Sequence, residues 1–231
     1  MFPKWMNLFP TVSAVAGLLG TCTIIGGFWY YATPKFFRVG YMPTQPGGGF
    51  SHQLHAGKLG MDCRYCHTKV EESAEANIPN VATCVGCHAE DRLTLFQTSD
   101  THKALTQFVR DAYAADQPIA WARVHKLPDY VRNFPHQVHL QAGVSCFSCH
   151  GRIDQMPIVY HAEPLSMGWC LECHREPEAS LVPREQVTNL NWVEEHLAQR
   201  QSGAAGAVTT GKQLLDSLRN APPENCGACH Y

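Results

Sequence analysis

The chain has 231 residues, of which 45% are hydrophobic and 16% charged, and its formal net charge is −2. Its lysines and arginines form no run, which excludes the basic patch that a nucleic-acid-binding protein needs for phosphate. Eleven cysteines, 18 glycines and 15 prolines indicate many turns and a chemistry that depends on sulfur.

The first predicted element is a membrane helix. No charged residue lies between Lys4 and Lys35, and residues 11–32 are all apolar or small, a length that crosses a bilayer at about 1.5 Å per residue. Aromatic residues flank this segment, as is common at headgroup level: Trp5, Phe9, Phe28, Trp29, Tyr30 and Tyr31. We expect an uncleaved anchor in residues 1–42, because the apolar core of a signal peptide is typically shorter.

Five copies of the pattern Cys-x-x-Cys-His follow, and they use ten of the eleven cysteines. The cysteine pairs are Cys63 and Cys66, Cys84 and Cys87, Cys146 and Cys149, Cys170 and Cys173, and Cys226 and Cys229. Two cysteines at this spacing reach both vinyl groups of one porphyrin, while the next histidine reaches the iron. Zinc sites need no histidine after every second cysteine, and a disulfide framework does not repeat one local motif. The sequence therefore predicts five covalently bound haem c groups.

Five haems in the roughly 180 residues after position 50 leave too little polypeptide for an ordinary core. We expect a mainly α fold with much irregular structure, in which residues 43–231 form a multihaem cytochrome c domain organised around stacked haems. The haem propionates add further negative charge. Because bacteria attach haem c on the exported side of the membrane, we expect a single-pass protein of the inner membrane with its haem domain in the periplasm.

The haem domain contains an internal repeat. After a linker rich in proline and glycine at residues 43–49, the pattern Phe-x-His-x-x-His occurs at 50–55 and again at 134–139. Two haem sites follow each copy, so residues 50–90 and 134–175 look like two versions of one unit. The fifth site, at about 222–231, is appended outside the duplication.

Three more helices are predicted outside the haem sites. Residues 101–115 carry apolar side chains on one helical face, with Ser99, Asp100 or Thr101 as the cap. Residues 190–201 and 211–220 read as two short amphipathic helices, and the stretch between them, 202–207, is predicted to be a loop because it is rich in alanine and glycine.

The motif histidines are the predicted proximal iron ligands: His67, His88, His150, His174 and His230. The repeated Phe-x-His-x-x-His pattern supplies the predicted distal ligands His52, His55, His136 and His139. Two histidines three residues apart on a short helix can serve two neighbouring haems.

One distal position is left over. Met156 and Met167 flank the approach to the fourth haem, and His161 lies between them. We favour a methionine, which would raise the potential of that haem, over His161. An open position is the third alternative and would make the haem a catalyst. We expect His102, His125 and His196 to be solvated or bound to propionates.

Residues 50–175 resemble the pentahaem cytochrome c subunit of alternative complex III, the bacterial quinol:electron-acceptor oxidoreductase. The resemblance rests on the Phe-x-His-x-x-His pattern and on residues 62–71, 121–124, 155–157 and 165–175. The resemblance implies a relay subunit in a respiratory or photosynthetic complex that oxidises menaquinol. Its implied partners are integral membrane quinol-binding subunits, an iron-sulfur subunit, a monohaem cytochrome subunit and a soluble periplasmic acceptor.

Three functions fit these features. The leading hypothesis is electron relay, with no substrate-converting site of its own. The alternative is a membrane-anchored multihaem quinol dehydrogenase that feeds a periplasmic reductase. A third is a multihaem enzyme that reduces nitrogen or sulfur oxyanions at a five-coordinate iron.

Overall fold

A computed structural model describes residues 3–34, 49–121, 124–125, 127, 131 and 134–230. Residues 43–48 of the predicted linker, together with Ala122 and Arg123, lie outside the described residues. The chain divides into two compact units, residues 1–41 and 42–231.

The first unit consists of one long helix, α1 (Phe9–Pro34), preceded by the short 3-10 helix η1 (Lys4–Leu8). The segment from Lys4 to Trp29 is long and apolar enough to cross a membrane, and none of it is buried against the rest of the protein. Amino-terminal signal sequences share this length and composition. The described part of the chain therefore has one candidate membrane helix, at the predicted position.

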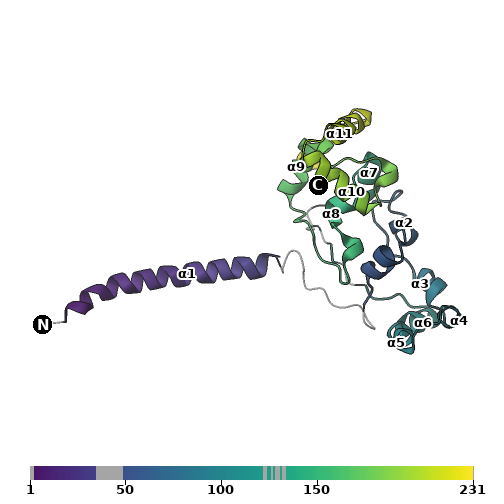
Figure 1. Cartoon of the computed structure of the whole chain (residues 1–231), viewed down its shortest axis with the longest axis horizontal. Helices are drawn as coiled ribbons and strands as arrows, with labels where there is room; N and C mark the ends of the chain where they lie inside the picture. The colour runs from purple at the N-terminus through teal and green to yellow at the C-terminus, as the bar shows by residue number, and fades with distance from the viewer. Residues whose placement is uncertain are drawn as a thin grey trace. The chain divides into compact units, whose positions relative to one another are not determined.

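The second unit is built from short helices joined by irregular connections (Figure 1). Its helices are η4 (Gln53–Lys58), α2 (Cys63–Cys66), α3 (Val81–His88), α4 (Glu90–Leu95), α5 (Asp100–Leu105), α6 (Gln107–Ala114), α7 (His136–Ala142), α8 (Cys146–His150), η5 (Ile153–Gln155), α9 (Met167–Arg175), η6 (Pro177–Ala179), η7 (Arg184–Gln186), α10 (Leu190–Gln201), α11 (Ala205–Ser217) and α12 (Cys226–Cys229). The described residues form no strand, only an isolated bridge between Val144 and Leu181. The mainly helical class is confirmed.

The polypeptide core of this unit is small. Leu140, Val182, Val187 and Val193 form its centre, where α7, η7 and α10 meet. The buried hydroxyl of Ser145 donates to the carbonyl of Val187 at 2.6 Å and joins this cluster to the start of α8. A cluster of four buried aliphatic residues supplies little hydrophobic stabilisation for a unit of this length, as expected if haem completes the core.

The predicted helix at 101–115 is wrong as one element, because the chain breaks into α5 and α6 at Thr106. The Thr106 hydroxyl donates to the carbonyl of His102 at 2.8 Å, a back-bond that bends helices. The cap is Ser99, whose hydroxyl accepts from the amide of His102. Val109 is buried as predicted, whereas Tyr113 is exposed.

The predicted helix at 190–201 is confirmed as α10. The helix predicted at 211–220 is shifted, because α11 runs from Ala205 to Ser217. Residues 205–207, which are half of the predicted loop, are therefore helical. Alanine is the best helix former, so an alanine-rich stretch continues a helix once packing supports it. Helix α11 packs closely against η6 at Gly211, which has no side chain. A Cβ atom at this position would lie only 2.3 Å from the carbonyl oxygen of Glu178 in η6.

Arg200 fastens these carboxyl-terminal helices together. It is 9% exposed, and its guanidinium donates to three backbone carbonyls, those of Glu178, Leu181 and Ala207, at 2.6 to 3.0 Å. It also donates to Nε2 of His196 at 3.0 Å. Burial lowers the pKa of Arg200 from its usual value, so these hydrogen bonds must offset the desolvation of the cation.

We therefore predict that Arg200→Met destabilises the holoprotein by about 2–4 kcal/mol, because three partly buried carbonyls lose their donor. Chemical denaturation followed by far-ultraviolet circular dichroism measures the loss. Arg219→Met, at an exposed arginine just beyond α11, is the matched control. Equal stability of the two variants would contradict this account of Arg200.

Candidate haem-binding sites

Each Cys-x-x-Cys-His motif lies on a helix, and we number the sites 1 to 5 in chain order. At sites 1 and 3 the first cysteine begins a short helix and the preceding residue caps it. Asp62 caps α2 by accepting from the amide of Arg64 at 2.8 Å, and Ser145 caps α8 by accepting from the amide of Phe147 at 3.1 Å. Such caps fix the helix start, and therefore the direction of the cysteine pair.

Sites 2 and 4 instead lie within longer helices. Asn80 caps α3 and Ser166 caps α9, each by accepting from the amide three residues later. The two repeat copies thus share one order, a motif on a short capped helix followed by a motif at the end of a longer one.

A cavity of about 1760 Å³ lies among the first three sites. Its walls include the cysteines of sites 1 to 3, and His52, His55, His136 and His139 from the repeated pattern. A pocket for one small ligand usually measures about 300–1,000 Å³. The cavity therefore has the size and the donor atoms for more than one large cofactor.

Five of the predicted iron ligands are oriented by the protein backbone. In each, Nδ1 lies 2.6 to 2.9 Å from a carbonyl oxygen, which leaves Nε2 available; the pairs are His55 with Ser51, His67 with Asn77, His136 with Ala74, His139 with Pro135, and His174 with Pro223. Histidines that bind metals almost always donate their other ring N–H in this way. These residues fit the role of iron ligands.

Other predicted ligands are buried without such a carbonyl. The Nδ1 atoms of His52, His88 and His150 are buried and have no hydrogen-bond partner in the described protein. Burial lowers the pKa of His52 to about 4 and that of His150 to about 3. Both imidazoles are therefore neutral near pH 7, which is the form that binds metals.

The two Phe-x-His-x-x-His segments have the same ring geometry. Phe50 stacks on His55 with ring centroids 4.4 Å apart, and Phe134 stacks on His139 at 4.7 Å. The same phenylalanines meet His52 and His136 edge to face at 4.9 Å and 5.0 Å. Each phenylalanine therefore orients both histidines of its segment.

Two histidine pairs are spaced to share one iron. The ring centroids of His55 and His88 are 6.1 Å apart, and those of His139 and His174 are 6.2 Å apart. A histidine nitrogen binds a first-row metal at about 2 Å, so two imidazoles on opposite faces of one ion have centroids about 6 Å apart. The second histidine of each repeated segment thus faces the second haem site of its own copy.

The three candidates for the remaining ligand have different surroundings. Met156 is 2% exposed, and its carbonyl accepts from the amide of Gln53. Met167 is 65% exposed and begins α9, one turn before Cys170. His161 donates from Nε2 to the carbonyl of Val124 at 2.6 Å, so the nitrogen that usually binds haem iron is already engaged.

His125 has surroundings that sequence reasoning missed. The sequence predicts that it is solvated or bound to a propionate; it is half-buried, stacks on His161 at 4.7 Å and lies 4.3 Å from the ring of His150. Its Nε2 is buried without a partner, and burial lowers its pKa to about 4. Because His125 belongs to no repeated motif, the sequence does not indicate that it is buried beside His150. The other two histidines of this group also contact rings, His102 on His88 at 5.7 Å and His196 on Trp192 at 4.4 Å.

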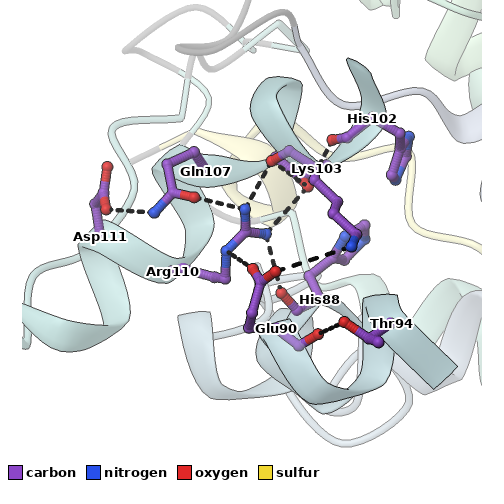
Figure 2. Close-up of polar contacts among 9 residues, drawn as sticks. His88, Glu90, Thr94, His102, Lys103, Gln107, Arg110 and Asp111 are labelled. Atoms are coloured by element: carbon purple, nitrogen blue, oxygen red, sulfur yellow. Dashed lines mark hydrogen bonds and ion pairs between the residues drawn. The ribbon is translucent and has the colours of Figure 1, made fainter. Parts of the chain in front are cut away.

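An arginine network supports the helix of site 2 (Figure 2). Arg110 donates to the carbonyl of His88 at 3.2 Å and to that of Lys103 at 2.7 Å, and it pairs with Glu90 at 3.4 Å. Its side chain is 12% exposed. A cation at the end of α3 also complements the helix dipole. Arg110 therefore fixes the residue that would hold the haem iron at site 2.

Similar arginines stand beside three other sites. Arg64 joins site 1 to Asp62 and Glu71, and Arg152 joins site 3 to Asp154 and Glu194 of α10. Arg175 joins site 4 to Glu224 at 3.1 Å. Each of these arginines links its haem helix to another segment.

Comparison with known proteins supports a haem function. Residues 132–231 match the family described as cytochrome c7 and related cytochrome c. Over 123 residues the chain is 29% identical to the menaquinone reductase, multihaem cytochrome c subunit, of Nitratidesulfovibrio vulgaris. The match covers 53% of this chain and 52% of that relative, so it spans about half the length of each. Part of the second unit is thus similar to cytochrome c proteins, which fits covalently bound haem c at its Cys-x-x-Cys-His motifs.

We predict that Arg110→Met lowers the potential of the haem at site 2, because a nearby cation favours the reduced iron. Stability should fall by about 2–3 kcal/mol as the carbonyls lose their charged donor. Arg110→Lys should keep most of the potential, and Arg92→Met, at an exposed residue of α4, is the control. Potentiometric titration of the visible haem bands measures the effect. A shift as large in Arg92→Met as in Arg110→Met would refute the role of Arg110.

Proposed function

We propose that this chain, a multihaem cytochrome c, is the electron-relay subunit of a membrane-bound quinone-linked oxidoreductase. The observation that carries the proposal is the pairing of histidines about 6 Å apart at two sites, repeated in the two copies. An iron held between two imidazoles has no open position for a substrate. This coordination favours electron relay over oxyanion reduction.

Bound haem c supplies one-electron redox chemistry at iron. The chain's own residues would hold each group in place through two cysteines, and carbonyl contacts at Nδ1 orient five of the ligating imidazoles. Burial lowers the pKa of His52 and His150 and so keeps these two imidazoles neutral near pH 7. The phenylalanines of the repeated segments stack on His55 and His139. None of these roles makes or breaks a bond in a substrate.

The five motif histidines are the proximal ligands in this proposal, and eight of the ligands fall into four pairs within their own repeat copy. His55 serves site 2 with His88, and His139 serves site 4 with His174. His52 serves site 1, because it lines the same cavity as His67. By the repeat, His136 serves site 3, whose His150 lines that cavity as well.

The remaining distal position then belongs to site 5, and Met167 is the better methionine for it. Met167 is exposed and begins α9, and the end of α9 contacts the segment that leads into site 5, because Nδ1 of His174 lies 2.6 Å from the carbonyl oxygen of Pro223. Met156 is instead packed in the protein interior. A methionine ligand would raise the potential of this haem above that of its bis-histidine neighbours.

The complex that we favour is alternative complex III, with the chain anchored in the inner membrane by α1 and the five haems on the periplasmic side. Its quinol-binding, iron-sulfur and monohaem cytochrome subunits would be partners, and a soluble protein would be the acceptor. The name of the Nitratidesulfovibrio vulgaris relative supports a second candidate, a menaquinone reductase. The two differ in the direction of electron flow, and a row of haems conducts both ways.

The test is electron exchange by the complex purified from native membranes. We expect a menaquinol analogue to reduce the haems of the complex, and co-purifying subunits to include a quinone-binding membrane protein. Menaquinone reduction by a reduced periplasmic cytochrome, without the reverse reaction, would support the reductase instead. If purified complex exchanges electrons with neither menaquinol nor menaquinone, the proposed function is wrong.

Met167→Ala should abolish the near-infrared charge-transfer band of methionine-bound ferric haem, while Met156→Ala should keep it. Loss of the thioether ligand also lowers the potential of one haem only. Magnetic circular dichroism of the oxidised holoprotein detects the band. Its absence from the unsubstituted protein, or its loss in Met156→Ala alone, would overturn the assignment of Met167.

A further inference from the structure

We propose that the five haems form one unbranched line in the order site 2, site 1, site 3, site 4, site 5. Sites 2 and 5 are then the two ends through which the chain exchanges electrons with its partners. The inference rests on the proposed relay function and adds the order of the haems, which chain order does not give.

The first link joins site 2 to site 1. His55, which faces His88 of site 2 at 6.1 Å, lies on the same short segment as His52, the proposed ligand of site 1. The second cysteine of site 1, Cys66, also lines the same cavity as Cys84 and Cys87 of site 2.

The second link joins site 1 to site 3, across the two repeat copies, which dock on each other reciprocally. The amide of Gln53 donates to the carbonyl of Met156, which follows site 3. Gly57 lies so close to this segment that a Cβ atom would be 2.2 Å from the carbonyl oxygen of Asp154. Each copy's histidine segment therefore packs behind the first haem site of the other copy.

The opposite half of this docking uses the second copy. The amide of His136 donates to the carbonyl of Ala74 at 3.1 Å, and the amide of Gln137 donates to that of Ser73 at 3.2 Å. Both carbonyls follow site 1 closely along the chain. Where the two copies meet, the first cysteines of their first sites, Cys63 and Cys146, line the same cavity.

The third link joins site 3 to site 4. The histidine segment that leads into site 3 also provides His139, which faces His174 of site 4 at 6.2 Å. His136, the proposed ligand of site 3, lies on the same helix α7 as His139. This link repeats the one between sites 1 and 2, as the duplication requires.

The fourth link joins site 4 to site 5. Nδ1 of His174 lies 2.6 Å from the carbonyl oxygen of Pro223, and Arg175 pairs with Glu224 at 3.1 Å. Pro223 and Glu224 lead directly into α12, which carries Cys226 and Cys229. Site 5 is therefore fastened to site 4.

The helices of sites 2, 3 and 4 are arranged in agreement with this order. In Figure 1, α3 of site 2 lies with α4, α5 and α6 toward one end of the unit, and α9 of site 4 lies toward the opposite end, with α8 of site 3 between them. An electron that enters at site 2 must then pass from site 1 to site 3 to reach site 4. That step is the bridge between the duplicated halves.

Locating the five irons in the holoprotein, by anomalous diffraction at the iron absorption edge, tests the order directly. We expect the irons of His67 and His150 to be adjacent, and the irons of His88 and His230 to have one close neighbour each. An iron of site 2 adjacent to that of site 4 or site 5, or an iron of site 5 between two others, would overturn the proposal.

A variant without the last haem tests the same order by electron transfer in the purified complex. Cys226→Ser with Cys229→Ser removes one end in our proposal. Exchange with one partner should then fall at least tenfold, while the other partner still reduces or oxidises all four remaining haems. Site 5 is not an end of the line if neither partner can reduce or oxidise all four remaining haems. The same conclusion follows if electron exchange slows with neither partner. Failure of the relay function itself would appear already in the unsubstituted complex, which would exchange electrons with neither partner.

Discussion

The gap between paired histidines is the constraint on which the rest of this structure depends. A spacing of about 6 Å between His55 and His88, and again between His139 and His174, leaves room for one metal ion and the plane of its macrocycle. Much of the remaining polypeptide serves to hold such pairs apart. Carbonyl oxygens contact Nδ1 of His55, His139 and His174, and phenylalanines stack on His55 and His139. The small aliphatic core around Val182 and Val193 joins segments but cannot by itself order a unit of this size.

Arginines provide a second level of organisation. Arg64, Arg110, Arg152 and Arg175 stand beside sites 1 to 4, and each pairs with a carboxylate. Exposed pairs such as that of Arg175 add little stability, whereas Arg110 and Arg152, which are mostly buried, fix the ends of the haem helices. Because haem separation sets the rate of electron transfer, rigid anchoring of these helices is a functional property.

Sequence patterns predicted those features that are determined by residues close together in the chain. The cofactor sites, the repeat, helix α10 and the apolar helix α1 all follow from spacing or periodicity within a few residues. Most failures have non-local causes. Helix α11 starts early because Gly211 lets it pack against η6, whereas the end of α5 at Thr106 is a local feature that the apolar periodicity did not reveal. The burial of His125 and the network around Arg110 depend on segments far apart in the chain. The backbone contacts between the two copies, such as that of His136 with Ala74, are equally non-local, so the order of the sites cannot be deduced from their order in the sequence.

The central claim is that every haem iron is held by two protein ligands, so that the chain relays electrons and converts no substrate. Electron paramagnetic resonance of the fully oxidised holoprotein tests this claim most directly, because six-coordinate iron with two strong ligands is low-spin. The account predicts low-spin signals that account for all the iron, with no change on addition of nitrite or sulfite. A high-spin signal that one of these anions converts to another form would contradict it.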